Sequence, residues 1–261
     1  MTSVQNNDPS DTVKLHSMKP ETINLLINLN REFYDAYAKS FSSTRYTIQP
    51  GIRLLLPQFL EVNNLLDMGC GNGNLALALL DAGFSGRYLG IDNSAGLLQV
   101  ASNGIPAKAK KRFTFMQVDL STKLEIFENM PDAIVCFAVI HHFPADPYLA
   151  RFFEFAAQNL VPNGKFFLST WQVKNSPRLQ NRILPWSVLG VNDQEVGIND
   201  LLLDWRADPS QPSHYRYVHH YDSETLTKAG VSAGFKLEED FYSDGKEGDL
   251  ALYEVWRRDE I

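Results

Sequence analysis

Hydrophobic residues recur along this chain with two different spacings, and the spacing changes several times. Steps of three and four residues over 20–41 predict a helix that ends at the polar turn 42–45. A second helix is expected over 52–60, and the polar, turn-rich residues 1–17 are expected to form a loose tail. The pattern of residues 1–60 therefore predicts a helical cap rather than a sheet.

From residue 64 onward, short apolar runs alternate with helical patterns. The expected strands cover 64–68, 87–91, 113–118, 133–139 and 165–170. Helices are expected over 75–82, after an N-cap at Ser94, and over 147–160. Strands that alternate with helices predict an α/β fold with a mostly parallel sheet and helices on both faces.

Residues 171–220 break this alternation, because they carry three tryptophans, several prolines and no clean period. We expect short helices or loops there. A helix with Ser223 as N-cap and a hairpin over 235–242 and 250–257 then close the sheet. One domain is expected, in four parts: 1–60 as tail and helical cap, 61–170 as a ligand-binding core, 171–220 as an insertion that forms one side of the ligand site or a lid, and 221–261 as C-terminal helix and closing hairpin.

Composition narrows the class of protein. The 261 residues are 44% hydrophobic and 21% charged, which is typical of a globular protein. Cys70 and Cys136 are the two cysteines and neither belongs to a CxxC pair, which excludes a disulfide framework and a cysteine-rich zinc module. No apolar run approaches a membrane span and no secretory leader is apparent, so we expect a soluble, cytoplasmic protein with no membrane contact.

Charge bears on the choice of partner. The net charge is −7, and six of these negative charges belong to residues 221–261. This balance disfavours a protein whose whole surface grips nucleic acid, but leaves room for a local basic face. The basic run at 108–112 is interpreted as solvated surface, with RNA phosphates as the alternative. His214, His219 and His220 lack a cysteine or carboxylate to complete a metal site, so no metal is expected.

The strongest motif is a glycine-rich turn between the strand at 64–68 and the following helix. Gly69, Gly71 and Gly73 allow positive φ and a close approach of the backbone to a ligand. Asp92 and Asp119 end the next two strands. Because the carboxyl ends of parallel strands meet at one edge, these groups are expected to form one ligand site, with Asp92 accepting hydrogen bonds from a ribose.

This set resembles the class I S-adenosylmethionine-dependent methyltransferases, whose first motif is matched by residues 66–73. The resemblance implies a Rossmann-like, mostly parallel seven-stranded sheet with an antiparallel last strand, S-adenosylmethionine as cofactor and S-adenosylhomocysteine as product. It implies that Asp67 lies near the methionine amino group and Asp119 near the adenine. The cofactor-binding residues it implies are Tyr34, Arg45, Asp67, Gly69, Gly71, Asn72, Asp92, Asn93, Asp119, Leu120 and Ala138.

Other segments bear on the methyl acceptor. After the fourth strand the chain reads AVIHHF, not the Asn/Asp-Pro-Pro-aromatic tetrad of enzymes that methylate base amines. FSSTR at 41–45, VIHHF at 139–143, and segments 203–205 and 215–219 together resemble the tRNA wobble-uridine carboxymethyl methyltransferases. That resemblance implies esterification of the carboxylate of 5-carboxymethyluridine at position 34 of a tRNA. It also implies a small zinc-protein adaptor as a possible partner.

The chemistry of a carboxylate acceptor selects the candidate catalytic residues. A carboxylate has a pKa of ~4, so it is ionised and needs no general base. Arg45 and Arg216 are candidates to clamp it through bidentate hydrogen bonds. His141 is the candidate for a hydrogen bond to the acceptor, and packing at the strand end is the alternative for it and for His142.

Two other functions stay open at this point. One is a methyltransferase for a small-molecule carboxylate or hydroxyl, with 171–220 as a closed lid over the acceptor. The other is a non-catalytic module that keeps the fold and binds a partner. The intact glycine turn and both aspartates disfavour this last reading.

Overall fold

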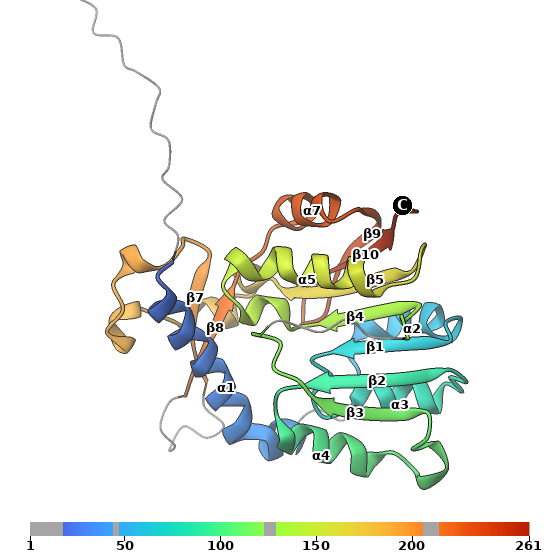
Figure 1. The fold of residues 1–261 in the computed structure, drawn as a ribbon. Coiled ribbons are helices and arrows are strands. Elements are labelled where there is room, and N and C mark those ends of the chain that lie inside the picture. The colour runs from blue at the N-terminus through green and yellow to red at the C-terminus, as the bar shows by residue number, and fades with distance from the viewer. Residues whose placement is uncertain (1–17, 44–46, 123–128, 206–213, 261) are drawn as a thin grey trace, which may run out of the picture.

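A seven-stranded sheet forms the centre of the molecule in the computed structural model, which describes residues 18–43, 47–122, 129–205 and 214–260 (Figure 1). Its strands are β1 (Asn64–Met68), β2 (Arg87–Asp92), β3 (Phe113–Gln117), β4 (Ala133–Phe137), β5 (Lys165–Trp171), β9 (Phe235–Ser243) and β10 (Ala251–Arg258). Their order across the sheet is β3-β2-β1-β4-β5-β10-β9. The five strands expected from the alternating patterns and the closing hairpin are all present.

The directions of the strands confirm the predicted fold class. Strands β1 to β5 pair in parallel, whereas β10 is antiparallel to both β5 and β9. The order reverses at β1, which lies between β2 and β4. In open parallel sheets such a reversal leaves a crevice at the carboxyl ends of the strands, where ligands bind. The fold therefore provides a crevice at the tips of β1 and β4.

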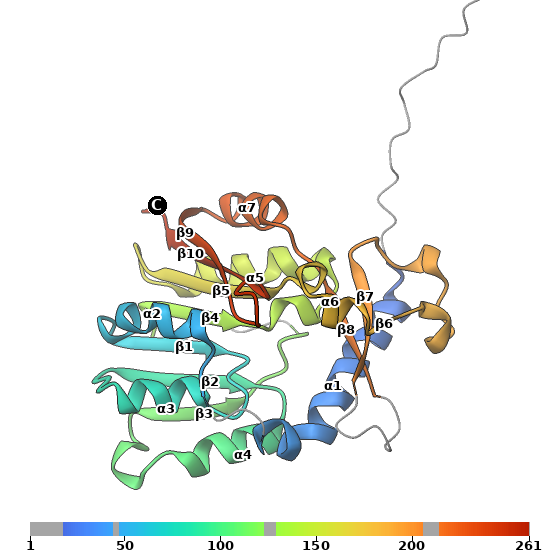
Figure 2. The same ribbon diagram turned by 180° about the vertical axis from the view of Figure 1, so that it is seen from behind.

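Helices cover both faces of the sheet, because successive residues of the inner strands point to opposite sides and both sides are apolar. Helices α5 (Ala145–Asn159) and α7 (Ser223–Ser232) lie on one face (Figure 1). Helices α2 (Pro50–Leu60) and α3 (Asn74–Asp81) lie on the other (Figure 2). Helix α4 (Ala95–Gly104) packs beside β2 and β3.

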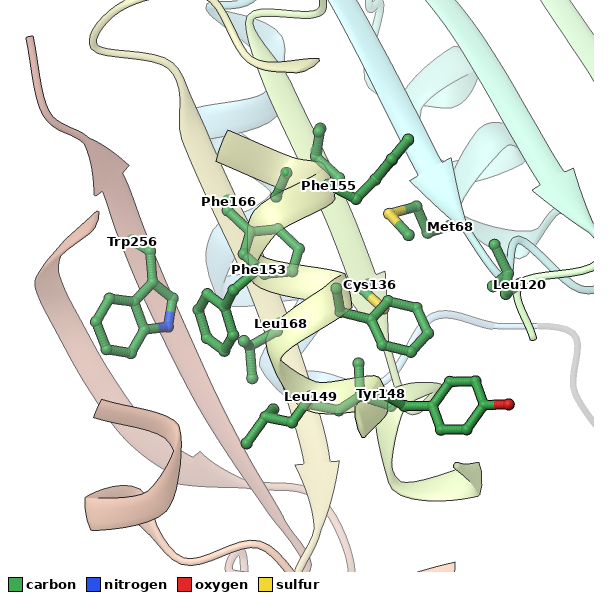
Figure 3. Packing of buried hydrophobic residues seen from close by; sticks show 14 of the residues in the cluster. Met68, Leu120, Cys136, Tyr148, Leu149, Phe153, Phe155, Phe166, Leu168 and Trp256 are labelled. Carbon is green, nitrogen blue, oxygen red and sulfur yellow. The ribbon is translucent and has the colours of Figure 1, made fainter. Parts of the chain in front are cut away.

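Aromatic rings fill the core beneath α5. Phe153 of this helix lies 5.4 Å, between ring centroids, from both Trp256 of β10 and Phe166 of β5, edge to face in each case. Met68 and Cys136 extend the same layer toward β1 and β4 (Figure 3). Each of these side chains is almost fully buried. Cys136 is thus a small core residue, and this core holds the strand tips in register.

A second sheet corrects the prediction for 171–220. This segment does contain short helical turns, among them α6 (Pro177–Gln180), but it also forms β6 (Ile183–Leu184), β7 (Asp200–Trp205) and β8 (His214–His219). These strands make an antiparallel sheet in the order β6-β7-β8. The expectation of helices and loops alone was wrong because β7 is apolar on both faces, so that it shows no alternation of polar and apolar residues.

The two faces of this small sheet bind it to the rest of the molecule. Leu202 packs with Leu26 of helix α1 (Pro20–Ser43), whereas Leu203 packs with Leu179 of α6. Helix α1 therefore does not lie on the main sheet. It crosses the carboxyl edge of that sheet, with the small sheet beyond it (Figures 1 and 2).

Of the two helix N-caps expected from the sequence, the structure confirms one. The Ser94 hydroxyl accepts a hydrogen bond from the Leu97 N–H, which confirms it as the N-cap of α4. Ser223 is not the cap of α7. Asp222 takes this place and accepts from the Thr225 N–H at 2.7 Å. In the described part of the chain, no helix combines the length and the apolar character needed to cross a bilayer.

Candidate functional site

A cavity of about 560 Å³ opens at the carboxyl edge of the main sheet, and α1 and the small sheet form its other walls. It reaches from the glycine turn after β1 to α6 and β8. The residues predicted from the sequence that line it are Tyr34, Asp67, Gly69, Gly71, Asn72, Asp92, Asn93, Asp119, Leu120, Ala138 and Arg216. His141 is not among the lining residues, and Arg45 lies outside the residues that the structure describes.

The glycine turn follows β1 directly and has the backbone conformation that glycine permits. Gly69 and Gly71 have φ of 77° and 55°. A Cβ at Gly69 would lie 2.3 Å from the Val139 Cγ2, so a side chain would collide with the wall after β4. The Gly71 N–H donates to the Asp92 carboxylate at 2.9 Å, which ties the turn to the tip of β2. This end of the cavity is thus built from backbone and carboxylate groups.

Two carboxylates face this turn, the buried Asp67 and the half-buried Asp92. Asp67 accepts a hydrogen bond from the Tyr88 hydroxyl at 2.5 Å, and its burial raises its pKa to about 7. Burial also raises the pKa of Asp92, although the N–H groups of Ser94 and Gly71 oppose the shift by donating to it. Both effects follow from the cost of holding a negative charge away from water. A cationic ligand group would relieve this cost.

The tip of β3 is tied to α1. The Arg31 Nη2 lies 2.7 Å from the Asp119 Oδ2, and the Ser121 hydroxyl donates to the other oxygen at 2.6 Å. The sequence analysis missed Arg31. Its place one turn before Tyr34 on the same helix was the available signal.

A strained residue follows β4. Ala138 has φ of 56°, which a residue with a side chain rarely adopts. Its N–H donates to both the carbonyl and the hydroxyl of Ser169 on β5, at 3.1 and 3.0 Å. These bonds hold the bend that leads into the 3₁₀ turn Ile140–His142.

The two adjacent histidines have different surroundings. His141 is fully buried, its Nδ1 accepts from the Trp171 N–H at 3.2 Å, and burial lowers its pKa, so it is neutral. His142 lines the cavity. Its Nδ1 lies 3.2 Å from the Tyr217 carbonyl and its Nε2 2.7 Å from the Tyr34 hydroxyl. Since a carbonyl only accepts, the His142 Nδ1 donates to it, which in the neutral tautomer leaves Nε2 to accept from the Tyr34 hydroxyl. Of the two histidines, His142 is therefore the one that faces the cavity.

Arg216 lies at the opposite end of the cavity and is only 5% exposed. Its guanidinium carbon lies 4.5 Å from the ring centroid of Trp171 and 5.0 Å from that of Phe33. Cation–π contacts of this kind hold the guanidinium group in one plane. Arg178 and Arg182 line the cavity as well. The cavity thus carries carboxylates toward the glycine turn and arginines toward the small sheet.

A buried asparagine connects the elements of this second end. The Asn30 side-chain amide donates to the carbonyls of His142 and Tyr217, at 2.9 and 3.0 Å, and its carbonyl accepts from the Tyr217 N–H at 2.9 Å. It therefore joins α1 to the turn after β4 and to β8. The sequence analysis missed Asn30, although a polar residue within the apolar stripe between Leu26 and Phe33 was a signal.

This chain is similar in sequence to known methyltransferases. A model of the methyltransferase domain matches residues 40–240. A tRNA (carboxymethyluridine(34)-5-O)-methyltransferase of Arabidopsis thaliana is 29% identical over 138 residues, which are 53% of this chain and 31% of the relative. A protein of the same name from Schizosaccharomyces pombe is 26% identical over 220 residues, 81% of this chain and 90% of the relative. The chain thus spans about a third of the length of the first of these relatives.

Solved structures share the fold. A S-adenosylmethionine-dependent methyltransferase of Methanosarcina mazei superposes with a TM-score of 0.62 at 18% identity, over 82% of this chain and all of the other. A solved complex between the Haloferax volcanii Trm112 methyltransferase activator and a methyltransferase matches with a TM-score of 0.58 at 16% identity, over 89% of this chain and 98% of the other. Together with the sheet order and the glycine turn, the family match shows that this chain belongs to the methyltransferase domain family, with a Rossmann-like fold.

Proposed function

We propose that this chain methylates the carboxylate of 5-carboxymethyluridine at the wobble position of a tRNA. The opposite charges at the two ends of one cavity carry the proposal: Asp67 and Asp92 lie toward the glycine turn, and Arg216 lies toward the small sheet. A cationic methyl donor suits the first end and an anionic acceptor suits the second. The names of the Arabidopsis and fission yeast relatives support the same acceptor.

The glycine-turn end fits the donor. S-adenosylmethionine supplies a methyl group on a positively charged sulfur, and S-adenosylhomocysteine is its product. Asp92 would hold the ribose hydroxyls, and Asp67 would pair with the ammonium group of the methionine part. Gly69 leaves room for close approach, because a side chain there would meet Val139. Tyr34, Asn72, Asn93, Asp119, Leu120 and Ala138 complete the proposed binding set.

The other end would orient the acceptor. The acceptor carboxylate is already ionised, so the protein needs to bind it, align it and exclude water. Arg216 would donate two hydrogen bonds to its oxygens. One oxygen then forms the new O–CH₃ bond while the C–S bond breaks and its electron pair stays on sulfur, and no proton moves. Arg45 stays a second candidate for the clamp. For the hydrogen bond to the acceptor we propose His142 rather than His141, because His142 lines the cavity and His141 is fully buried.

The test compares Arg216→Gln and Arg216→Lys with the wild type on an anticodon stem-loop that carries 5-carboxymethyluridine. We expect kcat/KM to fall about 100-fold for Gln, since a buried charge pair is lost, and less for Lys, which keeps the charge without the planar fork. Affinity for S-adenosylhomocysteine, measured by calorimetry, serves as the control and should change less than twofold. Base-labile methyl label on uridine identifies the ester.

Two results would refute the proposal. One is transfer by both Arg216 variants, and by Arg45→Ala, within twofold of the wild type. The other is a wild type that methylates free small acids but no RNA, because the acceptor would then be a small-molecule carboxylate.

We further propose that a small zinc-protein adaptor assists this domain in the cytoplasm, where tRNA is the substrate. The likeness to the solved complex with the Trm112 activator supports an adaptor, and so does the net charge of −7, which disfavours tRNA binding by this chain alone. Co-expression with and without such an adaptor, followed by the stem-loop assay, tests this. Equal activity of the two preparations would contradict it.

A further inference from the structure

The second end of the cavity contains a pair of arginines to which the proposed reaction gives no role. We propose that Arg178 and Arg182 form a phosphate site, which binds the phosphodiester next to the nucleoside that is methylated. This inference rests on the proposed function, because it describes how the same cavity takes its acceptor. The chemistry recognised is a phosphate attached to the acceptor nucleoside.

The arginine pair is held in a defined place. Arg178 belongs to α6, Arg182 follows four residues later, and both line the cavity. Leu179 between them is buried with Leu203 and Val218 of the small sheet. The Ser176 hydroxyl caps α6 by accepting from the Leu179 N–H. The segment is therefore anchored, and the two guanidinium groups do not depend on a loose loop for their position.

Both guanidinium groups are available. Among the described residues, neither group has a hydrogen-bond acceptor or an ion-pair partner. The acid that lines the cavity near the β9–β10 turn, Asp244, already accepts from the Gly51 N–H at 2.9 Å and the Tyr253 hydroxyl at 2.6 Å. Arg178 and Arg182 thus bring two positive charges to the cavity wall, and an anion bound there would offset them. Guanidinium groups match phosphate oxygens in a bidentate geometry.

Aromatic side chains lie at the same end of the cavity, where they could bind the base that connects the acceptor carboxylate to the phosphate. Trp171 and Trp205 line the same end of the cavity. Trp205 packs edge to face on Phe33 at 5.2 Å, and Phe33 in turn contacts Arg216. Unstacked bases bind on such rings. A carboxylate at Arg216, a base on an indole ring and a phosphate at Arg178 and Arg182 correspond to the parts of one nucleotide. A free acid without phosphate would leave the arginine pair unused.

The experiment uses three acceptors of increasing size: 5-carboxymethyluridine, its 3′,5′-bisphosphate and the anticodon stem-loop. The full chain is assayed as wild type and as Arg178→Gln/Arg182→Gln. We expect the wild type to prefer the bisphosphate over the nucleoside about tenfold in kcat/KM, and the double variant to lose this preference while its turnover of the nucleoside stays within twofold. For the stem-loop, the slope of log(kcat/KM) against log[salt] should become shallower by about one to two.

A matched control removes two positive charges elsewhere. Arg87 and Lys111 are exposed, lie at the amino ends of β2 and β3, and do not line the cavity. Arg87→Gln/Lys111→Gln should keep the bisphosphate preference. Affinity for S-adenosylhomocysteine and thermal unfolding check that each variant is folded. If the double variant does not fold, the single variant Arg178→Gln, at an exposed position, tests the same loss of preference.

The outcomes separate this inference from the proposed function. A wild type that prefers no phosphate, a double variant that keeps the preference, or a control that loses it equally would overturn the phosphate site while the methyl ester still forms. If the double variant loses activity on the bisphosphate but not on the stem-loop, the phosphate bound at this site belongs to a mononucleotide, and the proposal of a phosphodiester is overturned. If no 5-carboxymethyluridine acceptor is methylated, the proposed function fails, and the phosphate site fails with it.

Discussion

The two ends of the cavity are built in different ways. The glycine-turn end consists of the tips of β1, β2 and β3, which follow one another in the chain, and its groups are backbone N–H groups and carboxylates. The arginine end joins α1, α6 and β8, which lie far apart in the sequence; β8 packs against α1 through Tyr217 and against α6 through Val218 (Figure 2). A ligand part shared by many enzymes can thus be bound by one continuous motif, whereas the part particular to one enzyme is bound by side chains from scattered elements.

The largest effect is expected at the first end, from Gly69→Ala. The new Cβ would lie 2.3 Å from the Val139 Cγ2 and would stand on a backbone with φ of 77°, so the turn must move and carry its N–H groups away from their places. We expect affinity for S-adenosylhomocysteine to fall more than about 100-fold in calorimetry. If the two ends of the cavity are independent, the substitution should leave the binding of the acceptor at Arg216 unchanged.

Gly83→Ala is the matched control for this variant. Gly83 has φ of 85°, but nothing lies within 4 Å of its Cβ position and it is outside the cavity. It should lower the melting temperature through backbone strain alone and leave binding intact. Binding by Gly69→Ala within threefold of the wild type would contradict the account of the glycine turn.

The second prediction concerns the arginine end, through Asn30→Asp. In the wild type, the carbonyls of His142 and Tyr217 accept hydrogen bonds from the Asn30 amide. The substitution places a carboxylate oxygen against them instead. We expect the free energy of unfolding to fall by about 1–3 kcal/mol, because buried acceptors lose their donors. The KM for the acceptor should rise more than the dissociation constant of the cofactor product.

Asn103→Asp adds the same charge at an exposed position of α4 and provides the comparison. Thermal and denaturant unfolding measure the difference between the two variants. A loss of less than about 0.5 kcal/mol relative to Asn103→Asp would mean that Asn30 does not join the three elements.

The third and smallest effect is a dependence of cofactor affinity on pH. Burial raises the pKa of Asp67 to about 7, and the proposed ammonium partner requires the ionised form. Affinity for S-adenosylhomocysteine should therefore rise about tenfold from pH 6 to pH 8 and then level off. The sign is opposite for the ligand-free protein: since the pKa is raised in the folded state, the stabilising contribution of protonated Asp67 is lost as the pH rises toward 7.

Two variants sharpen this test. Asp67→Asn should bind weakly at every pH and remove the dependence. Tyr88→Phe removes the hydrogen bond that favours the charged carboxylate, so the midpoint should move to higher pH. A flat profile for the wild type between pH 6 and pH 8, measured by calorimetry, would contradict the assigned role of Asp67.

The difference between the two ends also explains which predictions from the sequence succeeded. Gly69, Asp92 and Asp119 could be identified because each lies at or just after the end of a strand expected from its apolar pattern, and parallel strands end at a common edge. His142 could not be separated from His141, because the bend at Ala138 decides which of the two faces the cavity. The small sheet was missed because β7 is apolar on both of its faces.

The amino-acid sequence by itself determined the strands and helices of the main sheet, the glycine turn and the acidic strand tips, because each of these depends on residues close together in the chain. Only the tertiary structure decided that Arg216 is stacked between Phe33 and Trp171, that Asn30 joins α1 to β8, and that Arg178 and Arg182 line the same cavity. The contacts of Arg216 and Asn30 bring together residues more than thirty positions apart, and no local pattern records which distant side chains will meet when the faces of the small sheet are buried.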